Sequence, residues 1–358
     1  MDAKQKYTVM GLMSGTSLDG LDMACCSFEK VGNKWSFRII AAKTLKYPAR
    51  WKKILSEAHE LSGEQLVATD IAYGRFIGTS AVNFIKTYRL KVDFISSHGH
   101  TVFHQPRKGF TFQLGNGNAI HAVTGLPLVC DFRSLDVILG GEGAPLVPAG
   151  DKFLFDDYDV CINLGGIANL STDQKRQRIA FDICFCNMGL NHVAAQAGKE
   201  FDNNGQMAAD GEVHKPMFRQ LDKIYSVIRK KRPSLGREIF ESKVKGLLDD
   251  DRVSINDRLA TLTESAAVEI VRAIPANIKN ARVLCTGGGA FNSFLISRIL
   301  DHAGDRLTLI IPDEDIIKFK EALVFAFLGV LRVRDEANCL RSVTGASQDS
   351  SGGILVGF

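Results

Sequence analysis

The sequence predicts an α/β protein of two lobes, and three observations favour this fold class. Short apolar strands repeatedly end in polar, glycine-rich loops, as in open α/β sheets that carry binding groups at the carboxyl ends of their strands. Both halves of the chain begin with a strand and a glycine-rich turn, at Met10–Gly20 and at Asn163–Gly166. The length of 358 residues agrees with two domains. We therefore expect two related lobes around a central cleft.

The first half contains most of the expected strands. Each is a short apolar or alternating run bounded by turn residues, and the helices show apolar residues near helical spacing. We expect strands at Tyr7–Leu12, Leu21–Phe28, Trp35–Lys43, Val92–Ser96, Phe110–Leu114 and Leu126–Cys130, and helices at Ala49–Leu61, at Gly63–Tyr88 and from Ala119.

The second half restarts the same pattern after a Gly/Pro-rich segment, Gly140–Gly150, which marks a domain junction. We expect strands at Tyr158–Leu164, Arg178–Asp182 and Arg282–Cys285, and helices at Asn256–Ile274, from Phe291 and at Lys318–Arg334. The predicted lobes are residues 1–130 with 341–358, and residues 131–340.

Composition narrows the function classes. Apolar residues make up 45% and charged residues 23%, and the net charge of +4 is spread over both halves, so no basic nucleic-acid footprint is indicated. The longest apolar run, Ala322–Leu331, falls short of the roughly 18–20 residues of a membrane helix. The beginning of the chain lacks the apolar core of a signal peptide. Eight cysteines without a Cys-x-x-Cys pair indicate buried, reduced thiols. We expect a cytoplasmic protein.

The first candidate site is the polar segment Met13–Asp22, which contains the turn Ser14–Gly20. Glycines let a backbone approach an anion closely, hydroxyls add donors, and an acidic residue can hold Mg²⁺ through water. The alternative is an ordinary turn, because Ser, Gly and Asp favour turns anyway.

Two later glycine turns also follow strands, at Asn163–Asn169 and at Thr286–Asn292. A helix N-terminus with free amides attracts phosphate. Neither turn is a Walker loop or a dinucleotide fingerprint, and each alone could be a plain tight turn. Three such turns at strand ends in one chain favour a phosphate site.

Asp182 ends a strand-like run and can act as a general base, or it can cap the next helix. His98, His100 and His104 could form a zinc site, but the spacing fits no standard ligand pair. We expect His98 to be a polar group of the cleft and the other two to be loop residues. The segments Asp131–Asp136 and Gly140–Pro145 could bind sugar hydroxyls or simply turn the chain.

The motifs that carry these groups resemble those of the anhydro-N-acetylmuramic acid kinases. The matching segments run in order along the chain: Met13–Asp22, Ser97–Thr101, Gln113–Gly115, Gly140–Pro148, Ile162–Asn169, Phe201–Gly205, Cys285–Asn292, Lys320–Ala322 and Thr344–Ala346. The resemblance implies an actin/hexokinase-like (ribonuclease H-like) ATPase fold. It also implies a reaction of peptidoglycan turnover, in which MgATP phosphorylates a ring-opened anhydrosugar.

Roles for individual residues follow from that resemblance. Asp182 resembles the catalytic base that activates water. The residues that resemble ATP ligands are Gly15, Thr16, Ser17, Leu18, Asp19, Gly20, Leu21, Asp22, Gly165, Gly166, Asn169, Gly287, Gly288, Gly289 and Asn292, with Asp19 also assigned to Mg²⁺. Those assigned to the sugar are His98, Asn116, Arg133, Glu142 and Asn187. A homodimer is a further expectation.

The chain departs from the family pattern at four places. Ile183–Cys186 replaces a glycine-rich turn after Asp182, Asn116 replaces an aspartate, Ser134 replaces a basic residue and Glu142 replaces a glutamine. These changes are expected around the sugar, where buried polar pairings set specificity. Three alternatives therefore stay open: a kinase of the same fold for another small sugar, a nucleotide-binding regulator with little turnover, and a metal hydrolase at the histidine cluster.

Overall fold

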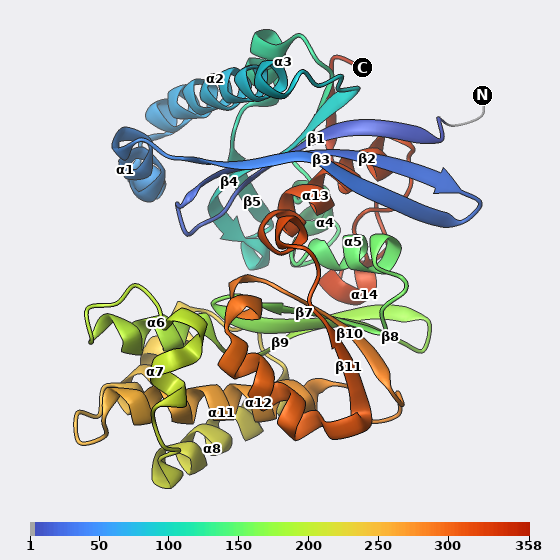
Figure 1. Cartoon of the computed structure of the whole chain (residues 1–358). Coiled ribbons are helices and arrows are strands. Elements are labelled where there is room, and N and C mark those ends of the chain that lie inside the picture. Colours follow the sequence, from blue (N-terminus) through green and yellow to red (C-terminus); the bar gives the residue numbers. More distant parts are fainter. Residues whose placement is uncertain (1–3) are drawn as a thin grey trace. The chain divides into compact units, whose positions relative to one another are not determined.

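The computed structural model describes residues 4–358. By its internal contacts the chain divides into two compact units. Unit 1 runs up to Phe155 and resumes at Phe319–Phe358, and unit 2 is Asp156–Lys318. Each unit contains one sheet with its own helices (Figure 1). The domain boundaries predicted from the sequence, after residues 130 and 340, stay predictions.

Unit 1 begins with three long strands and adds shorter strands after its first helices. Its elements are β1 (Lys6–Ser14), β2 (Gly20–Val31), β3 (Lys34–Lys46), α1 (Ala49–Glu57), α2 (Gly63–Tyr88), β4 (Phe94–Gln105), β5 (Phe110–Leu114), α3 (Gly117–Thr124), β6 (Leu128–Cys130), α4 (Ser134–Ile138), α5 (Val147–Leu154), α13 (Glu314–Val333, whose first residues belong to unit 2), α14 (Arg341–Thr344) and β12 (Ile354–Val356).

Within the described residues, the sheet of unit 1 has the order β12-β6-β4-β1-β2-β3, with β5 paired to β4. Strand β2 is antiparallel to both β1 and β3, whereas β4 and β6 run parallel to β1. The predicted hairpin with a polar tip is confirmed, because Ser14 pairs with Leu21 across residues 15–20.

The two faces of this sheet are covered by different helices (Figure 1). Met10 and Leu12 of β1 join Tyr73 and Ile77 of α2 in one buried apolar core. Because side chains alternate along a strand, Gly11 lies on the other face. There a Cβ at Gly11 would lie only 1.9 Å from the carbonyl oxygen of Ala322, so α13 packs directly on the strand backbone.

Unit 2 is built from three strands, a run of helices and two more strands. Its elements are β7 (Val160–Leu164), β8 (Ile167–Gln174), β9 (Gln177–Phe185), α6 (Asn187–Ala195), α7 (Gln206–Ala209), α8 (Lys215–Lys231), α9 (Arg237–Ile239), a π-helical turn (Phe240–Val244), α10 (Lys245–Leu248), α11 (Ile255–Ala273), β10 (Ala281–Thr286), a 3₁₀ turn (Gly288–Phe291), α12 (Ser293–Ala303) and β11 (Leu307–Ile310).

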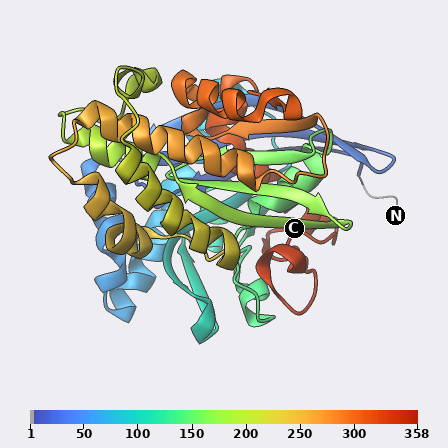
Figure 2. The same cartoon turned by 90° about the horizontal axis from the view of Figure 1, so that it is seen from below.

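The sheet of unit 2 has the order β11-β10-β7-β8-β9 within the described residues. Strands β7, β8 and β9 are antiparallel, and β10 and β11 run parallel to β7. Figure 2 shows α8 and α11 laid across a face of this sheet, where Tyr225 and Leu262 join the buried core of the unit.

The two sheets share one topology. In each, three antiparallel strands precede two that run parallel to the first, which gives the spatial order 3-2-1-4-5 counted along the main strands of the unit. Two such sheets, one per unit, are the arrangement of the ribonuclease H-like fold in actin/hexokinase-like proteins. The predicted fold class is therefore confirmed.

Several predicted element boundaries were wrong. Strand β4 runs through Ser97–Thr101, which was predicted to be a loop, because the backbone passes Gly99 at φ +74° and pairs with β5 from His100 onward. Strand β9 likewise continues past Asp182 to Phe185. Strands β8 and β11 and helix α8 were not predicted.

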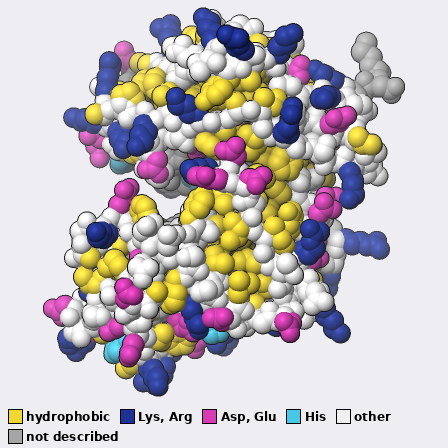
Figure 3. All heavy atoms as spheres, viewed as in Figure 1, with side chains coloured by type: hydrophobic (Ala, Val, Ile, Leu, Met, Phe, Trp, Pro, Cys, Tyr) yellow, Lys and Arg dark blue, Asp and Glu magenta, His cyan; other side chains and the backbone are white. Residues whose placement is uncertain are grey.

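Figure 3 shows basic and acidic side chains interspersed over the face in view.

Candidate functional site

The carboxyl ends of the parallel strands collect most of the predicted residues of each unit. In unit 1, Ser14 at the end of β1 pairs with His100 of β4, and Asp131 follows the end of β6. In unit 2, β7 and β10 end side by side, so the glycine turns after Leu164 and Thr286 lie at one edge of the sheet. Open α/β sheets use this edge for ligands.

The polar turn of unit 1 covers residues 15–19, and its side chains at Thr16, Ser17 and Asp19 are exposed. Leu18 adopts φ +60°, a strained conformation for a residue with a Cβ, and its N–H donates to the Gly15 carbonyl over 3.3 Å. This turn therefore offers hydroxyls and backbone amides to an incoming anion.

The last three residues assigned to this turn, Gly20 to Asp22, belong to strand β2 instead. A Cβ at Gly20 would lie 2.6 Å from the Leu45 carbonyl oxygen, so the glycine permits close pairing with β3. The Leu21 side chain is buried in the core, which leaves only its backbone for a ligand. Thr44 donates a hydrogen bond to the Asp22 carboxylate.

Two carboxyl groups of unit 1 influence each other, and one of them was missed as a candidate. Burial raises the pKa of Asp22; the Thr44 hydrogen bond opposes this shift, and the nearby Asp19 adds to it. Glu321 of α13 keeps an exposed surface, but desolvation raises its pKa and the Asp22 charge raises it further, while the charges of Arg133 and Lys320 partly oppose this shift. The sequence signal was a glutamate at the start of the apolar run of α13.

His98 and Arg133 form a fixed pair. Arg133 Nε donates to His98 Nε2 over 2.8 Å, and Nη1 donates to the Gly143 carbonyl. Because arginine only donates, His98 must carry its proton on Nδ1, which faces the Gly99 carbonyl at 2.9 Å. Burial and the adjacent Arg133 charge lower the pKa of His98 well below its usual range. Burial lowers the pKa of Arg133 to about 10, so it stays charged at neutral pH.

His100 was predicted to be a loop residue, but it lies buried in β4. Its Nδ1 is 2.9 Å from the Ser14 hydroxyl. His104, also assigned to the loop, is in the same strand and its Nδ1 is 3.2 Å from Thr111 Oγ1. Among residues 4–358, no group of three or more His, Cys, Asp or Glu side chains is placed to hold a metal ion.

Asn116 has a structural role that the sequence did not reveal. Its Oδ1 accepts from the Ala119 N–H and caps α3, while its Nδ2 donates to Asp70 of α2 over 3.0 Å. Asp70 also accepts from the Gly115 N–H. Both ends of the Asn116 amide are thus engaged within unit 1, and its assignment to the sugar stays a prediction.

Glu142 lies on a loop that is held by a buried carboxylate. Asp136 accepts from the Gly143 N–H and from the Thr344 hydroxyl, both over 2.8 Å. The Glu142 N–H donates to the Thr344 carbonyl, and its carboxylate is exposed. The loop is therefore fixed, while the Glu142 side chain remains available to a ligand.

In unit 2 the glycine turns pack on one another. The N–H groups of Cys186 and Met188 donate to the Gly166 carbonyl, and that of Asn187 donates to the Gly165 carbonyl. Asn187 Nδ2 also donates to the Leu164 carbonyl over 3.0 Å. Gly287 has φ +83°, and a Cβ at this position would lie only 2.8 Å from the backbone of Leu164. Only glycine therefore fits there.

The two asparagines assigned to ATP, Asn169 and Asn292, differ in their surroundings. Asn292 is mostly buried, and its Oδ1 caps α12 by accepting from the Leu295 N–H over 2.9 Å. Asn169 lies in β8, directly opposite Asp182 of β9 in the strand register. The structure thus places Asn169 beside the predicted base, although its sequence motif was interpreted as a turn.

Asp182 has the properties of a general base. It is half-buried, and its Oδ2 accepts from the Leu235 N–H over 2.8 Å. No described residue donates a hydrogen bond to its Oδ1, so that oxygen can take a proton. Burial raises the pKa of the carboxyl, and the Leu235 hydrogen bond only partly offsets this. The alternative of a helix cap is wrong, because the N-cap of α6 is Cys186.

The unusual segment Ile183–Cys186 points inward. All four side chains are at most 4% exposed and belong to the core of unit 2. A register shift between Ala168 and Asn169 in the pairing with β9 leaves Ile183 as the extra residue of a bulge beside Asp182. The added bulk therefore fills the core of the unit instead of projecting to solvent.

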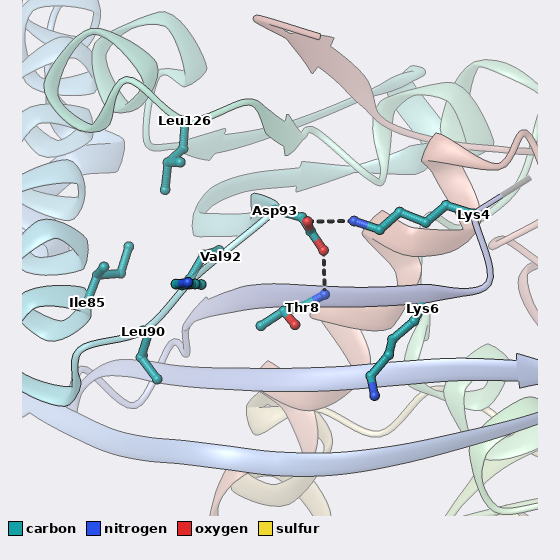
Figure 4. Close-up of a pocket in the computed structure, with 9 residues that line it drawn as sticks. Lys4, Lys6, Thr8, Ile85, Leu90, Val92, Asp93 and Leu126 are labelled. Atoms are coloured by element: carbon teal, nitrogen blue, oxygen red, sulfur yellow. Dashed lines mark hydrogen bonds and ion pairs between the residues drawn. The ribbon is translucent and has the colours of Figure 1, made fainter.

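A separate pocket of about 650 Å³ lies at the opposite edge of the unit 1 sheet, at the beginnings of β1 and β4 (Figure 4). Ile85, Leu90 and Leu126 line it, and Asp93 binds both the Lys4 ammonium and the Thr8 N–H there. None of the predicted site residues lines this pocket. In the described part of the chain, no helix has the length and apolarity to cross a membrane.

Comparisons with known proteins agree with the sequence motifs. The family model described as anhydro-N-acetylmuramic acid kinase matches residues 7–357. The chain is 34% identical to the protein of that name from Microcystis aeruginosa, over 94% of this chain and 97% of the relative. It is 35% identical to that from Synechococcus elongatus, over 95% and 96% of the two chains.

Similarity to solved structures is more distant. Component A of the Acidaminococcus fermentans (R)-2-hydroxyglutaryl-CoA dehydratase aligns with a TM-score of 0.44 and 13% identity, over 89% of this chain and 96% of that chain. The family is shown by the sequence matches, which cover nearly the whole chain. This chain belongs to the anhydro-N-acetylmuramic acid kinase family.

Proposed function

We propose that this protein is an anhydro-N-acetylmuramic acid kinase of peptidoglycan turnover. It hydrolytically opens 1,6-anhydro-N-acetylmuramic acid and phosphorylates O6 to give N-acetylmuramic acid 6-phosphate. The observation that carries the proposal is the family match over residues 7–357. The half-buried carboxylate of Asp182, with one oxygen free to take a proton, supports it.

The proposed reaction has two steps, opening of the anhydro bridge and transfer of the phosphoryl group. Asp182 takes a proton from water as the water oxygen bonds to the anomeric carbon, and the bond from that carbon to the bridging oxygen breaks. The freed O6 attacks the γ-phosphorus of ATP, and the bond to the leaving ADP oxygen breaks. Asp182 then releases its proton to solvent. The raised pKa of Asp182 improves it as a base relative to an ordinary aspartate.

ATP is assigned to glycine and hydroxyl groups of both units. In unit 1 these are residues 15–19 and the backbone of Gly20–Asp22, with the exposed hydroxyls of Thr16 and Ser17 as donors. In unit 2 they are Gly165, Gly166, Asn169 and Gly287–Gly289, with Asn292 supporting the helix that follows. Backbone amides at such turns suit phosphate oxygens.

The carboxyl groups of unit 1 fit Mg²⁺. Magnesium in kinases is held by one or two carboxylates together with substrate phosphates and water. Asp22 and Glu321 repel each other and both have a raised pKa, so a cation near them would relieve that repulsion. Asp19, the residue assigned to Mg²⁺ from the sequence, lies near enough to Asp22 to raise its pKa, but the three carboxyl groups are not gathered into one cluster among the described residues. Bound Mg²⁺ would neutralise charge on the transferring phosphoryl group.

The sugar is assigned to His98, Asn116, Arg133, Glu142 and Asn187. Arg133 is charged and fixed by His98 and Gly143, which suits it to the carboxylate of the substrate. Cytoplasmic location and a homodimer belong to the same proposal, because the reaction consumes cellular ATP and the two-fold dimer is the commonest symmetric assembly of soluble proteins.

The test is an ADP-release assay with MgATP and 1,6-anhydro-N-acetylmuramic acid, followed by mass analysis of the sugar product. We expect sugar-dependent ADP and a product that has gained both water and a phosphoryl group. In heavy-oxygen water the label should enter the sugar and not the phosphoryl group. A label in inorganic phosphate, or no sugar-dependent ADP from protein that binds ATP, would contradict the proposal and favour another sugar or a regulatory role.

A further inference from the structure

Beneath the polar turn of unit 1 lies a chain of four buried polar side chains, here called the hydroxyl chain: Tyr73, Tyr47, Ser14 and His100. The oxygens of the two tyrosines are 2.6 Å apart, Tyr47 donates to Ser14 Oγ over 2.7 Å, and Ser14 Oγ is 2.9 Å from His100 Nδ1. Each of the four side chains is at most 5% exposed.

The proton order in this chain follows from its donors. Because Tyr47 donates to Ser14, the Ser14 hydroxyl is left to donate to His100 Nδ1, which must therefore carry a lone pair. Burial lowers the pKa of His100 to about 4, so the ring is neutral and this tautomer has its proton on Nε2. Tyr73 can then donate to Tyr47, and all three bonds point the same way. Such chains polarise and strengthen one another.

The hydroxyl chain joins four separate elements at the base of the turn. Tyr73 comes from α2, Tyr47 follows β3, Ser14 is the last residue of β1 and His100 belongs to β4. Ser14 directly precedes Gly15, so its position sets where the turn begins.

The turn above needs support of this kind. Leu18 is held at φ +60°, which costs a residue with a Cβ about 1–2 kcal/mol. Strained backbone persists only where the surrounding structure over-determines it. The Leu18 side chain packs on the apolar core from one end of the turn, and the hydroxyl chain holds Ser14 at the other.

We propose that the hydroxyl chain positions residues 15–19 to bind the phosphates of ATP, so that Tyr47, Tyr73 and His100 are positioning residues for the nucleotide. This rests on the proposed function of the turn. None of the three needs to touch ATP, because they act through Ser14.

The test compares Tyr47→Phe with Tyr73→Phe and with a matched control. Tyr47→Phe removes the donor to Ser14, and we expect about a three- to tenfold rise in the KM for ATP and in the Kd for MgATP measured by calorimetry without sugar. Tyr73→Phe breaks only the far end and should have a smaller effect in the same direction. The KM for the sugar should change less than twofold.

The control is Tyr225→Phe in unit 2, which removes a fully buried tyrosine hydroxyl that does not belong to the hydroxyl chain. We expect no change in either KM. A merely structural role for the hydroxyl chain would reduce the active fraction, and thus kcat, without raising the Kd for MgATP. That result with Tyr47→Phe would overturn the proposal.

A rescue pair keeps the proposal testable if Tyr47→Phe does not fold. His100→Asn can place an oxygen acceptor where Nδ1 was, whereas His100→Ala leaves Ser14 without one. We expect the alanine variant to weaken MgATP binding and the asparagine variant to restore most of it; equal Kd values for the two would overturn the proposal. Because calorimetry with MgATP needs no turnover, a wild-type protein that binds ATP but does not phosphorylate the sugar would count against the proposed function alone.

Discussion

The two units share one sheet topology but support their first hairpins in different ways. In unit 1 the connection between β1 and β2 is an open polar turn of residues 15–19, held from below by the side chains of Tyr47 and Ser14. In unit 2 the connection between β7 and β8 is the two-residue turn Gly165–Gly166, whose carbonyl oxygens accept from the start of α6.

This difference indicates a division of labour. The unit 1 turn leaves its exposed hydroxyls and backbone amides for a ligand, because its support comes from side chains beneath it. The carbonyl oxygens of the unit 2 turn instead accept hydrogen bonds from the N–H groups of Cys186–Met188. This segment begins four residues after Asp182. The same topological position therefore carries exposed hydroxyls in unit 1, whereas in unit 2 it also anchors the segment that follows the strand of the proposed base.

The largest expected effect comes from Asp182→Asn. An asparagine oxygen can still accept from the Leu235 N–H, but it cannot take a proton from water. We expect kcat to fall by at least about 10³-fold, with the Kd for MgATP unchanged within twofold. The acid limb of the wild-type kcat/KM should lie above the usual aspartate pKa of about 3.9, because burial raises the pKa of Asp182 and the base must be deprotonated.

Asp202→Asn is the matched control for that variant. Asp202 is also a buried carboxylate of unit 2, and it accepts from the N–H groups of Met207 and Ala208. Its replacement should lower thermal stability and leave kcat within about twofold, because an asparagine oxygen retains part of these bonds. Similar losses of kcat in the two variants would mean that Asp182 supports the fold and is not the base.

The second prediction concerns how each first strand meets its neighbours. Gly11 of β1 lies three residues before the strand end, where a Cβ would lie 1.9 Å from a backbone oxygen of α13. The corresponding residue of β7 is Cys161, a buried side chain. Gly11→Ala should cost about 3 kcal/mol or more, because the clash is with backbone, and lower Tm by at least about 6 °C.

Cys161→Ala is the comparison, since it removes one buried atom and adds no clash. It should cost about 1 kcal/mol, the scale of one buried methylene-sized group. Thermal unfolding followed by circular dichroism measures both variants. Equal destabilisation would show that α13 can shift away from β1, and that the close approach at Gly11 is not required.

Sequence reasoning succeeded where the signal was local. The hairpin at Ser14–Gly20, the long helix α2 and the strand that carries Asp182 were all predicted, because apolar periodicity and turn residues lie within short windows. It failed for β8, which is mostly polar, for β11, which has only 4 residues, and for the motif around His98, where the strand continues through a glycine.

The supporting residues could not have been found in this way. Tyr47 lies 33 residues from Ser14, and Asp70 lies 46 residues from Asn116, so only the fold brings each pair together. A single sequence carries no signal for such long-range hydrogen bonds. For the same reason, the core position of the Ile183–Cys186 side chains was not predictable, since an apolar run next to a proposed base looks the same in the sequence whether it faces solvent or core.

The smallest predicted effect tests whether side chains also hold the second turn of unit 1, at residues 115–116. Asn116→Asp keeps an oxygen to cap α3 but replaces the amide that donates to Asp70, so two carboxylates would meet about 3 Å apart. Their repulsion raises the folded-state pKa of the pair above the unfolded value. The variant should therefore be about 1–2 kcal/mol less stable than wild type at pH 7.

The sign of the pH dependence distinguishes repulsion from lost packing. A raised folded-state pKa means that the variant recovers stability as the pH falls toward the usual aspartate range near 4, because the folded pair binds a proton more readily than the unfolded chain. Asn116→Ala loses the cap and the Asp70 hydrogen bond without adding charge, so its deficit should stay nearly constant with pH. Urea unfolding of both variants between pH 4 and pH 8 would measure this. A constant deficit for Asn116→Asp would mean that Asp70 moves away, and that a backbone contact, as in unit 2, holds this turn.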